Sequence, residues 1–86
     1  MMTNIGFGNL VASSRVVALV SPDSAPIRRL VQDAKDAGIA VDVTSGKKTR
    51  SVLLTDSGHV ILSSLAPETL RRRLDGEEAK DGDDEA

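Results

Sequence analysis

Four consecutive residues combine three cations with a hydroxyl: Lys47, Lys48, Thr49 and Arg50. Neighbouring lysines and arginines repel one another, and a threonine hydroxyl adds a donor suited to phosphate oxygens. No acidic residue lies between Asp42 and Asp56, so the adjoining sequence offers the cations no neutralising partner. The pattern indicates a site for an anionic polymer. The alternative is a solubilising loop tip that binds nothing.

Apolar segments on both sides must position this basic run. Residues 39–43 and 52–54 are mostly apolar or β-branched, and Gly46 lies between them. Two strands joined by a glycine-containing turn would form a hairpin with the cations at its tip. Such a rigid tip would keep the charges close together and favour anion binding.

The rest of the chain predicts further strands and two helices. One helix is expected before Gly38, because apolar residues recur at i, i+3, i+4 and i+7 from Ile27. A second helix is expected at residues 67–74, with Pro67 at its first position. Further strands are expected at residues 5–7, 10–20 and 59–64. The expected order is ββαβββα, a small α+β domain with a twisted, mainly antiparallel sheet.

Charge divides the chain at Leu74. Residues 1–74 carry ten Lys and Arg against six acids, whereas residues 75–86 carry one Lys against seven acids. This last segment has no Val, Ile, Leu or aromatic side chain to bury, so we expect one domain at 1–74 and a disordered acidic tail at 75–86. The tail could compete with an anionic ligand, and a chain ending at Leu74 is then expected to bind that ligand more tightly at low salt.

Self-association is expected from the size of the domain. About 74 residues hold a marginal core, and the chain has no cysteine and one histidine to supply a disulfide or a structural metal. Residues Val16–Val20 are apolar on both faces of a strand, so we expect another subunit to cover one face. The glycines within Asn4–Asn9 lack the further glycine and the helix of a dinucleotide loop, and indicate a bulge or a close subunit contact.

Catalysis has little support in the sequence. His59 is the single imidazole, and the nearby Asp56 and Ser57 do not align a nucleophile, a base and an orienting acid. We expect no enzyme activity, no metal, no cofactor and no small-molecule substrate. The sequence shows neither a secretory signal pattern nor an apolar run near the ~18 residues of a membrane span, so a soluble cytoplasmic protein is expected.

The other cations have competing explanations. Arg15 is grouped with the basic run as a candidate. Arg28 and Arg29 lie on the charged face of the first expected helix, which is typical of a solvated surface, and are secondary candidates. The arginines at 71–73 complement the dipole at the end of the second helix and the acids that follow. With one Phe and no Tyr or Trp, the chain favours a duplex held by its phosphates over a stacked single strand.

Five segments occur in a diagnostic order: Asn4–Asn9, Ser21–Ile27, Gly46–Arg50, His59–Ser63 and Pro67–Thr69. Together they resemble the bacterial RemA family of regulators of extracellular-matrix genes. The resemblance extends from Asn4 to Leu74 and leaves only the acidic tail outside it.

The resemblance implies a bacterial DNA-binding transcription regulator of matrix or biofilm genes, associated with the nucleoid. It also implies a closed ring of identical subunits, an octamer, that holds double-stranded DNA along its outer surface, and a domain reminiscent of the LytTR DNA-binding fold. Carried over by motif, the DNA-contacting positions are Arg15, Lys47, Lys48 and Arg50, and Thr49 joins them from the phosphate argument above.

One departure from the family pattern concerns the basic run. Relatives commonly show Tyr-Gly-Arg-Arg-Thr-Arg, whereas this chain has Ser45, Lys47 and Lys48 in place of the tyrosine and two arginines. Lysine cannot make the bidentate fork that reads guanine, so we expect binding led by charge and shape. The alternative is an oligomeric scaffold that docks on an acidic partner protein. An RNA-binding role is weakened by the missing aromatics.

Overall fold

The computed structural model describes residues 1–77, which form a small α+β domain, as expected. Its elements are β1 (Met2–Asn4), β2 (Leu10–Ala12), a 3₁₀ turn (Ser13–Arg15), β3 (Val16–Val20), α1 (Ala25–Ala37), β4 (Ala40–Asp42), β5 (Ser51–Thr55), β6 (Val60–Ser63) and α2 (Pro67–Leu74). The order is therefore βββαβββα, with one strand more than predicted before the first helix.

The strands form two sheets. β1 and β2 make an antiparallel hairpin, and the other four strands lie in the order β3-β5-β6-β4. β5 is antiparallel to both β3 and β6, whereas β4 runs parallel to β6. The predicted hairpin between residues 39–43 and 52–54 is therefore wrong, because β6 lies between β4 and β5 and the basic run crosses the end of β6.

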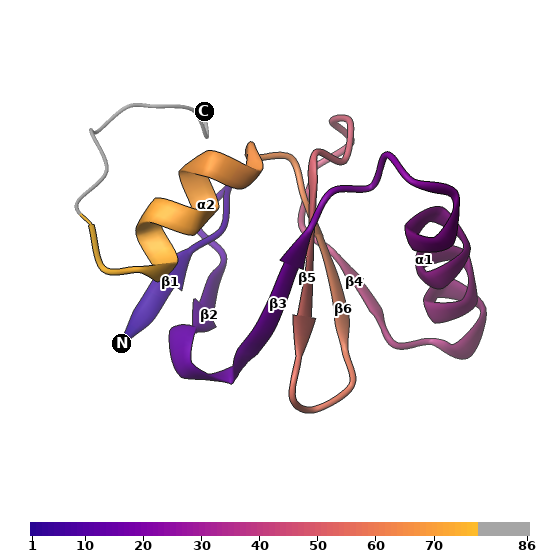
Figure 1. Cartoon of the computed structure of the whole chain (residues 1–86), viewed down its shortest axis with the longest axis horizontal. Coiled ribbons are helices and arrows are strands. Elements are labelled where there is room, and N and C mark those ends of the chain that lie inside the picture. Colours follow the sequence, from indigo (N-terminus) through magenta and orange to yellow (C-terminus); the bar gives the residue numbers. More distant parts are fainter. Residues whose placement is uncertain (78–86) are drawn as a thin grey trace.

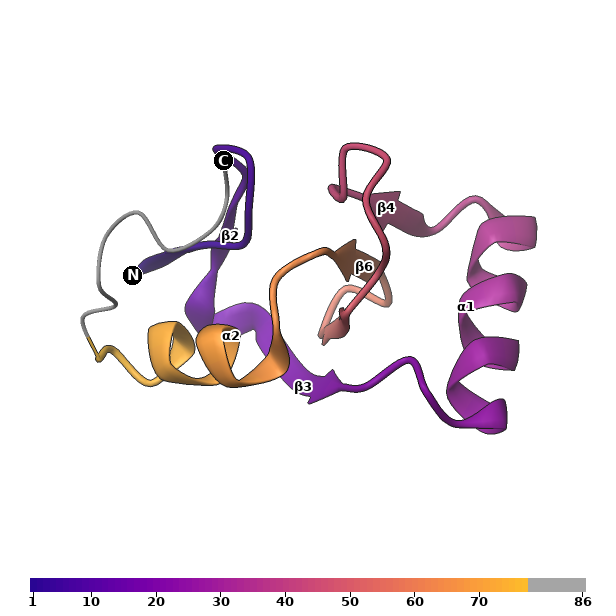
Figure 2. The same ribbon diagram turned by 90° about the horizontal axis from the view of Figure 1, so that it is seen from above.

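The four-stranded sheet is the central layer of the domain (Figures 1 and 2). α1 packs on one face through a cluster that includes Ala34, Val52 and Leu62. The hairpin and α2 cover the other face, where Leu53 and Leu70 are fully buried. Val16 and Leu19 of β3 pack against the cluster on one face and Val20 against the cluster on the other, whereas Val17 is 66% exposed. The expectation that another subunit covers part of this strand therefore stays a prediction.

Two buried serines tie the layers together. The Ser63 hydroxyl donates to the carbonyl of Ile5 at 2.8 Å and accepts from the amide of Leu65 at 3.1 Å. The Ser51 hydroxyl donates to the carbonyl of Leu65 at 2.6 Å. A buried polar group without a partner is costly, so these hydrogen bonds hold residues 64–66, which lead into α2, against the end of the sheet.

Local signals set the helix ends. Ser24 accepts from the amide of Ile27 at the start of α1, and Gly38 closes it in the left-handed region at φ 76°. α2 begins at Pro67, as predicted. Beyond Leu74, the amide of Glu77 donates to the carbonyl of Arg72, so the described chain continues past the predicted domain end. The rest of the predicted tail lies outside the described residues.

The N-terminal strands differ from the prediction. Residues 5–7 form the turn of the hairpin, with Gly6 at φ 118° and Phe7 at φ 54°, and β1 precedes them. Strands cannot hold two such residues in succession, which is why the apolar triplet is no strand. The expected strand at 10–20 is interrupted by the 3₁₀ turn, so the chain passes from the hairpin into the main sheet.

Candidate nucleic-acid interface

The basic run lies in the loop between β4 and β5, residues 43–50, called the basic loop below. Asp42 anchors its start: one carboxylate oxygen accepts from the Thr44 amide at 2.8 Å and from the Thr44 hydroxyl at 2.7 Å. The Lys47 amide then donates to the Thr44 carbonyl across Ser45 and Gly46, both with positive φ. This is the hydrogen-bonding pattern of a tight primed turn, which holds the cations on a short arc.

The anchor predicts a pH-dependent contribution to stability. Hydrogen bonds from the hydroxyl and then the amide of Thr44 lower the pKa of Asp42. A carboxyl group whose pKa is lower in the folded state than in the unfolded state stabilises the fold at pH values above its unfolded-state pKa, about 3.9. This stabilisation is lost as the pH falls through the folded-state pKa. Asp42→Asn should therefore unfold at a lower urea concentration at pH 7, and its difference from wild type should narrow by pH 3.

Asp42→Ala is the matched variant for this anchor. It leaves both donors of Thr44, a residue only 2% exposed, without their acceptor, so a loss of about 1–3 kcal/mol is expected at pH 7. Asn keeps an acceptor oxygen and should lose less. Identical urea midpoints for all three proteins at pH 7 would contradict the anchoring role.

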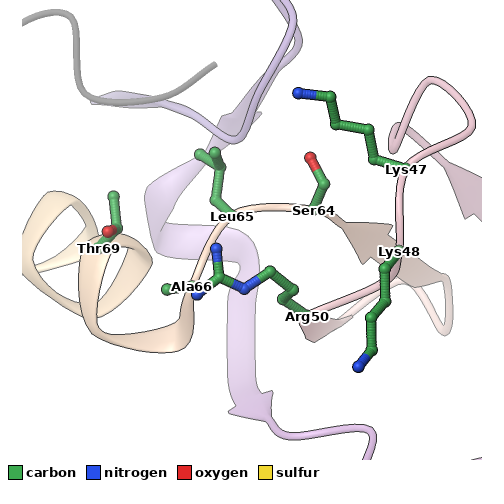
Figure 3. Close-up of a pocket in the computed structure, with 7 residues that line it drawn as sticks. All are labelled: Lys47, Lys48, Arg50, Ser64, Leu65, Ala66 and Thr69. Carbon is green, nitrogen blue, oxygen red and sulfur yellow. The ribbon is translucent and has the colours of Figure 1, made fainter. Parts of the chain in front are cut away.

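The basic loop and the start of α2 enclose a pocket of about 470 Å³ (Figure 3). Its lining residues are Lys47, Lys48, Arg50, Ser64, Leu65, Ala66 and Thr69. Arg50 extends toward Ala66 at the start of α2, whereas the amines of Lys47 and Lys48 point away from each other (Figure 3). This basic pocket unites three of the predicted residues with four that the sequence did not indicate.

The electrostatics of the basic pocket favour an anion. Lys47, Lys48 and Arg50 make no ion pair within residues 1–77. At the start of α2 no side chain caps the first amides, and Ala66 is the N-cap residue. Free amides and the positive end of the helix dipole therefore add to the three side-chain charges. A phosphate group has the charge and the acceptors that match this arrangement.

Arg15 lies outside the basic pocket. Its Nε is 2.9 Å from both carboxylate oxygens of Asp56, in the turn after β5. Arg50 immediately precedes β5, so the two arginines are separated by the length of that strand, roughly 20 Å at 3.3 Å per residue. Within one subunit the structure does not bring Arg15 together with the other predicted cations. Thr49 is partly exposed in the basic loop and does not line the pocket.

Arg28 and Arg29 belong to the opposite layer. They lie in the first turns of α1, which follows the end of β3 beside the beginning of β5. The guanidinium of Arg28 donates to the carbonyl of Asp23 at 2.9 Å. Both residues are thus at the same end of the sheet as the basic pocket but on its other face.

The arginines at the end of α2 make contacts within the fold. Arg71 forms ion pairs of 2.8 Å with Glu68 and with Asp75, and its hydrogen bond lowers the pKa of Glu68. Arg72 contacts Glu77, and Arg73 donates to the carbonyl of Asn4. The contacts of Arg71 and Arg72 fit the interpretation that this triplet complements the end of the helix and the acids that follow, and the Arg73 bond also ties the hairpin to α2.

The histidine has a local role. The Nδ1 atom of His59 is 2.8 Å from the hydroxyl of Ser57, while the carboxylate of Asp56 is occupied by Arg15. No nucleophile, base and acid are aligned among these residues. Within residues 1–77 no three acidic or histidine side chains gather closely enough to hold a metal ion. Neither α1 nor α2 is long and apolar enough to cross a membrane.

Comparison with known proteins agrees with the resemblance seen in the sequence. Residues 2–74 match the RemA-like family, described as extracellular matrix regulatory protein A-like. A relative from Heliobacterium modesticaldum is 54% identical over 99% of this chain and 93% of its own length. Relatives from Halothermothrix orenii and Dictyoglomus thermophilum are 56% and 57% identical, over 90% and 87% of this chain and 92% and 88% of their own lengths.

All three relatives are named provisionally as regulatory proteins. Together with the family description, these names support a regulatory role. With a match that extends through both sheets and both helices, the chain belongs to the RemA-like family.

Proposed function

We propose that this protein is a transcription regulator that binds double-stranded DNA through the basic pocket and has no catalytic role. The observation that carries the proposal is the set of three cations without an ion pair in residues 1–77 that line one pocket together with the uncapped start of α2. Phosphates repeat along a duplex, so neighbouring subunits can each contact a few of them. The extracellular-matrix description of the family makes matrix or biofilm genes the proposed targets, with the protein on the nucleoid in the cytoplasm.

We further propose that the subunits form a closed ring, an octamer. Exposed apolar residues occur at opposite edges of the four-stranded sheet: Val17 is 66% exposed on β3, and Val41 is 41% exposed on β4, with Ile39 before it. These two edges differ, so a contact between them is head-to-tail, and a head-to-tail contact closes into a ring when its rotation permits. Arg15, at the far end of β5, could then meet DNA held by a neighbouring copy.

Assembly matters for affinity because each subunit offers few charges. Three phosphate contacts predict a slope of log K against log salt of about −2.7, which is typical of weak, easily released binding. Copies linked in a ring bind one duplex with a high effective concentration, and avidity can exceed single-site affinity by roughly 10²–10⁴. The proposed mechanism is therefore multivalent charge-led binding.

Gel shifts of the full chain on duplexes of increasing length, at several salt concentrations, test this function. Affinity should rise with duplex length until the duplex spans several subunits, and should fall steeply with salt. Absence of any length or salt dependence would contradict duplex binding. Retained binding to a poly-glutamate peptide would then favour the scaffold alternative.

The acidic tail predicts a change in apparent affinity. Residues 78–86 carry five acids and one Lys, while Asp75 and Glu77 already pair with arginines of α2. A chain ending at Glu77 should therefore bind duplex DNA several-fold more tightly at 50 mM salt, because a competing anion is removed and the α2 contacts are kept. Fluorescence anisotropy measures the effect. The two chains should converge at high salt, and equal affinities at low salt would rule out competition.

A further inference from the structure

The turn of the β1–β2 hairpin places the single aromatic residue of the chain, Phe7, beside the basic pocket. The Nζ atom of Lys47 lies 5.6 Å from the centre of the Phe7 ring. Next to it, a Cβ atom at Gly6 would lie 3.6 Å from the Leu65 side chain, which lines the pocket. The hairpin turn and the basic loop rise on the same side of the molecule (Figure 2), so a duplex on the pocket would pass close to Phe7.

The backbone of the turn makes a phenylalanine at this position unexpected. Phe7 has φ 54° between two glycines that also have positive φ, a region that bulky L-residues avoid and that asparagine or glycine adopts readily. The turn is built by other groups: Asn4 accepts from the Gly6 amide at 2.8 Å, and Asn9 donates to the Gly6 carbonyl at 2.9 Å. The ring is therefore not needed to shape the turn.

Phe7 also contributes little to the core. Its ring is half-buried and belongs to neither of the two buried clusters that pack on the sheet. On the other side of Phe7, a Cβ atom at Gly8 would meet no atom of residues 1–77 within 4 Å, so no described part of the chain covers this end of the hairpin. An aromatic kept in an unfavourable conformation, outside the core and next to cations that make no ion pair in residues 1–77, points to a contact with a ligand.

We propose that Phe7 makes an apolar contact with the bound duplex while Lys47, beside its ring, holds a phosphate. This inference rests on the proposed DNA-binding function and adds to it an uncharged contact. A two-stranded ribbon has the width to enter a DNA groove, and phenylalanine serves as an apolar group against base edges and base steps. Because no charge is neutralised, this contact adds affinity without adding to the salt dependence.

The test compares Phe7→Asn, Lys47→Ala and the double variant with wild type on one duplex at several salt concentrations. Phe7→Asn should weaken binding about tenfold, the size of one aromatic contact to a base, and leave the salt slope unchanged. Its melting temperature should be equal to or above that of wild type, because asparagine accepts positive φ. Lys47→Ala should instead reduce the magnitude of the slope by about 0.9 for each subunit in contact.

The double variant distinguishes a contact between Phe7 and DNA from a role of Phe7 in orienting Lys47. If Phe7 touches DNA, Phe7→Asn weakens binding about tenfold in the Lys47→Ala background as well. If the ring only orients Lys47, the second change has no further effect, and the inference is overturned. Met2→Asn is the matched control, since it removes an exposed apolar side chain from the other end of the same hairpin, and it should leave affinity unchanged.

Two other results would also overturn the inference. Wild-type affinity for Phe7→Asn would show that the ring makes no contact with DNA. A smaller assembly of Phe7→Asn in sedimentation would assign the ring to a subunit contact. These outcomes differ from failure of the proposed function itself, in which wild type does not bind duplex DNA and the inference falls with it.

Discussion

Replacing Lys47, Lys48 and Arg50 together by alanine is expected to reduce duplex affinity by at least about 100-fold at 0.1 M salt. These three side chains carry the charge of the basic pocket and make no ion pair within residues 1–77. Their loss should also lower the magnitude of the salt slope by about 2.7 for each subunit on the duplex. Anisotropy titrations between 50 and 300 mM salt measure both quantities.

A matched variant distinguishes the effect of where the cations lie from the effect of total charge on affinity. Arg28→Ala, Arg29→Ala and Lys35→Ala remove the same number of cations from α1, on the opposite face of the sheet. This variant should lose much less affinity than the pocket variant. Equal losses would mean that binding follows net charge alone, and thermal denaturation of both proteins shows whether either change has disturbed the fold.

Helix ends and turns could be predicted from the sequence because their causes are local. The Ser24 side chain caps α1 by accepting a hydrogen bond from the amide three residues later, and Gly38 ends the helix. Both residues lie close in sequence to the backbone that they affect. Pro67 starts α2 for an equally local reason. In each case the signal lies within a few residues of the backbone that it affects.

Strand order was the main error, because it depends on contacts distant in sequence. Gly46 does form a tight turn, but that turn lies within a longer loop, and β5 pairs with β3 and β6 instead of β4. The carboxylate of Asp42 turns the chain away at Thr44, and nothing in the flanking apolar residues distinguishes this from a hairpin. The register of a strand and the strands beside it in the sheet depend on the packing of the whole core, and a short apolar run does not encode them.

The candidate site could be predicted only in part, because some of its residues come together through contacts distant in sequence. The basic run is contiguous, so Lys47, Lys48 and Arg50 could be grouped from the sequence. Thr69 comes to the pocket through the packing of α2, and Phe7 comes to Lys47 through the packing of the hairpin. Neither segment has a local sequence pattern that signals this contact with the basic run. The family motif groups Arg15 with these DNA-contacting candidates, yet its ion pair with Asp56 places it at the other end of β5.

If the proposed ring forms, Val41→Glu is expected to dissociate it and to weaken binding to long duplexes by about 100-fold, more than any single Lys→Ala change. Val41 is exposed at the β4 edge, so a carboxylate there is solvated in a lone subunit but buried in a subunit contact, where an unpaired charge is costly. Binding to a duplex short enough for one subunit should be unaffected. Sedimentation gives the assembly size, and anisotropy gives the two affinities.

Val41→Lys distinguishes loss of assembly from a change in charge. A lysine at this edge should dissociate the subunits as glutamate does, yet it adds a positive charge that by itself would strengthen attraction to phosphate. If assembly supplies the affinity, both variants bind long duplexes weakly, because each remaining subunit holds only its own three-cation pocket. If the lysine variant binds more tightly than wild type while sedimenting as a single subunit, avidity is not the mechanism and the charge of one subunit suffices.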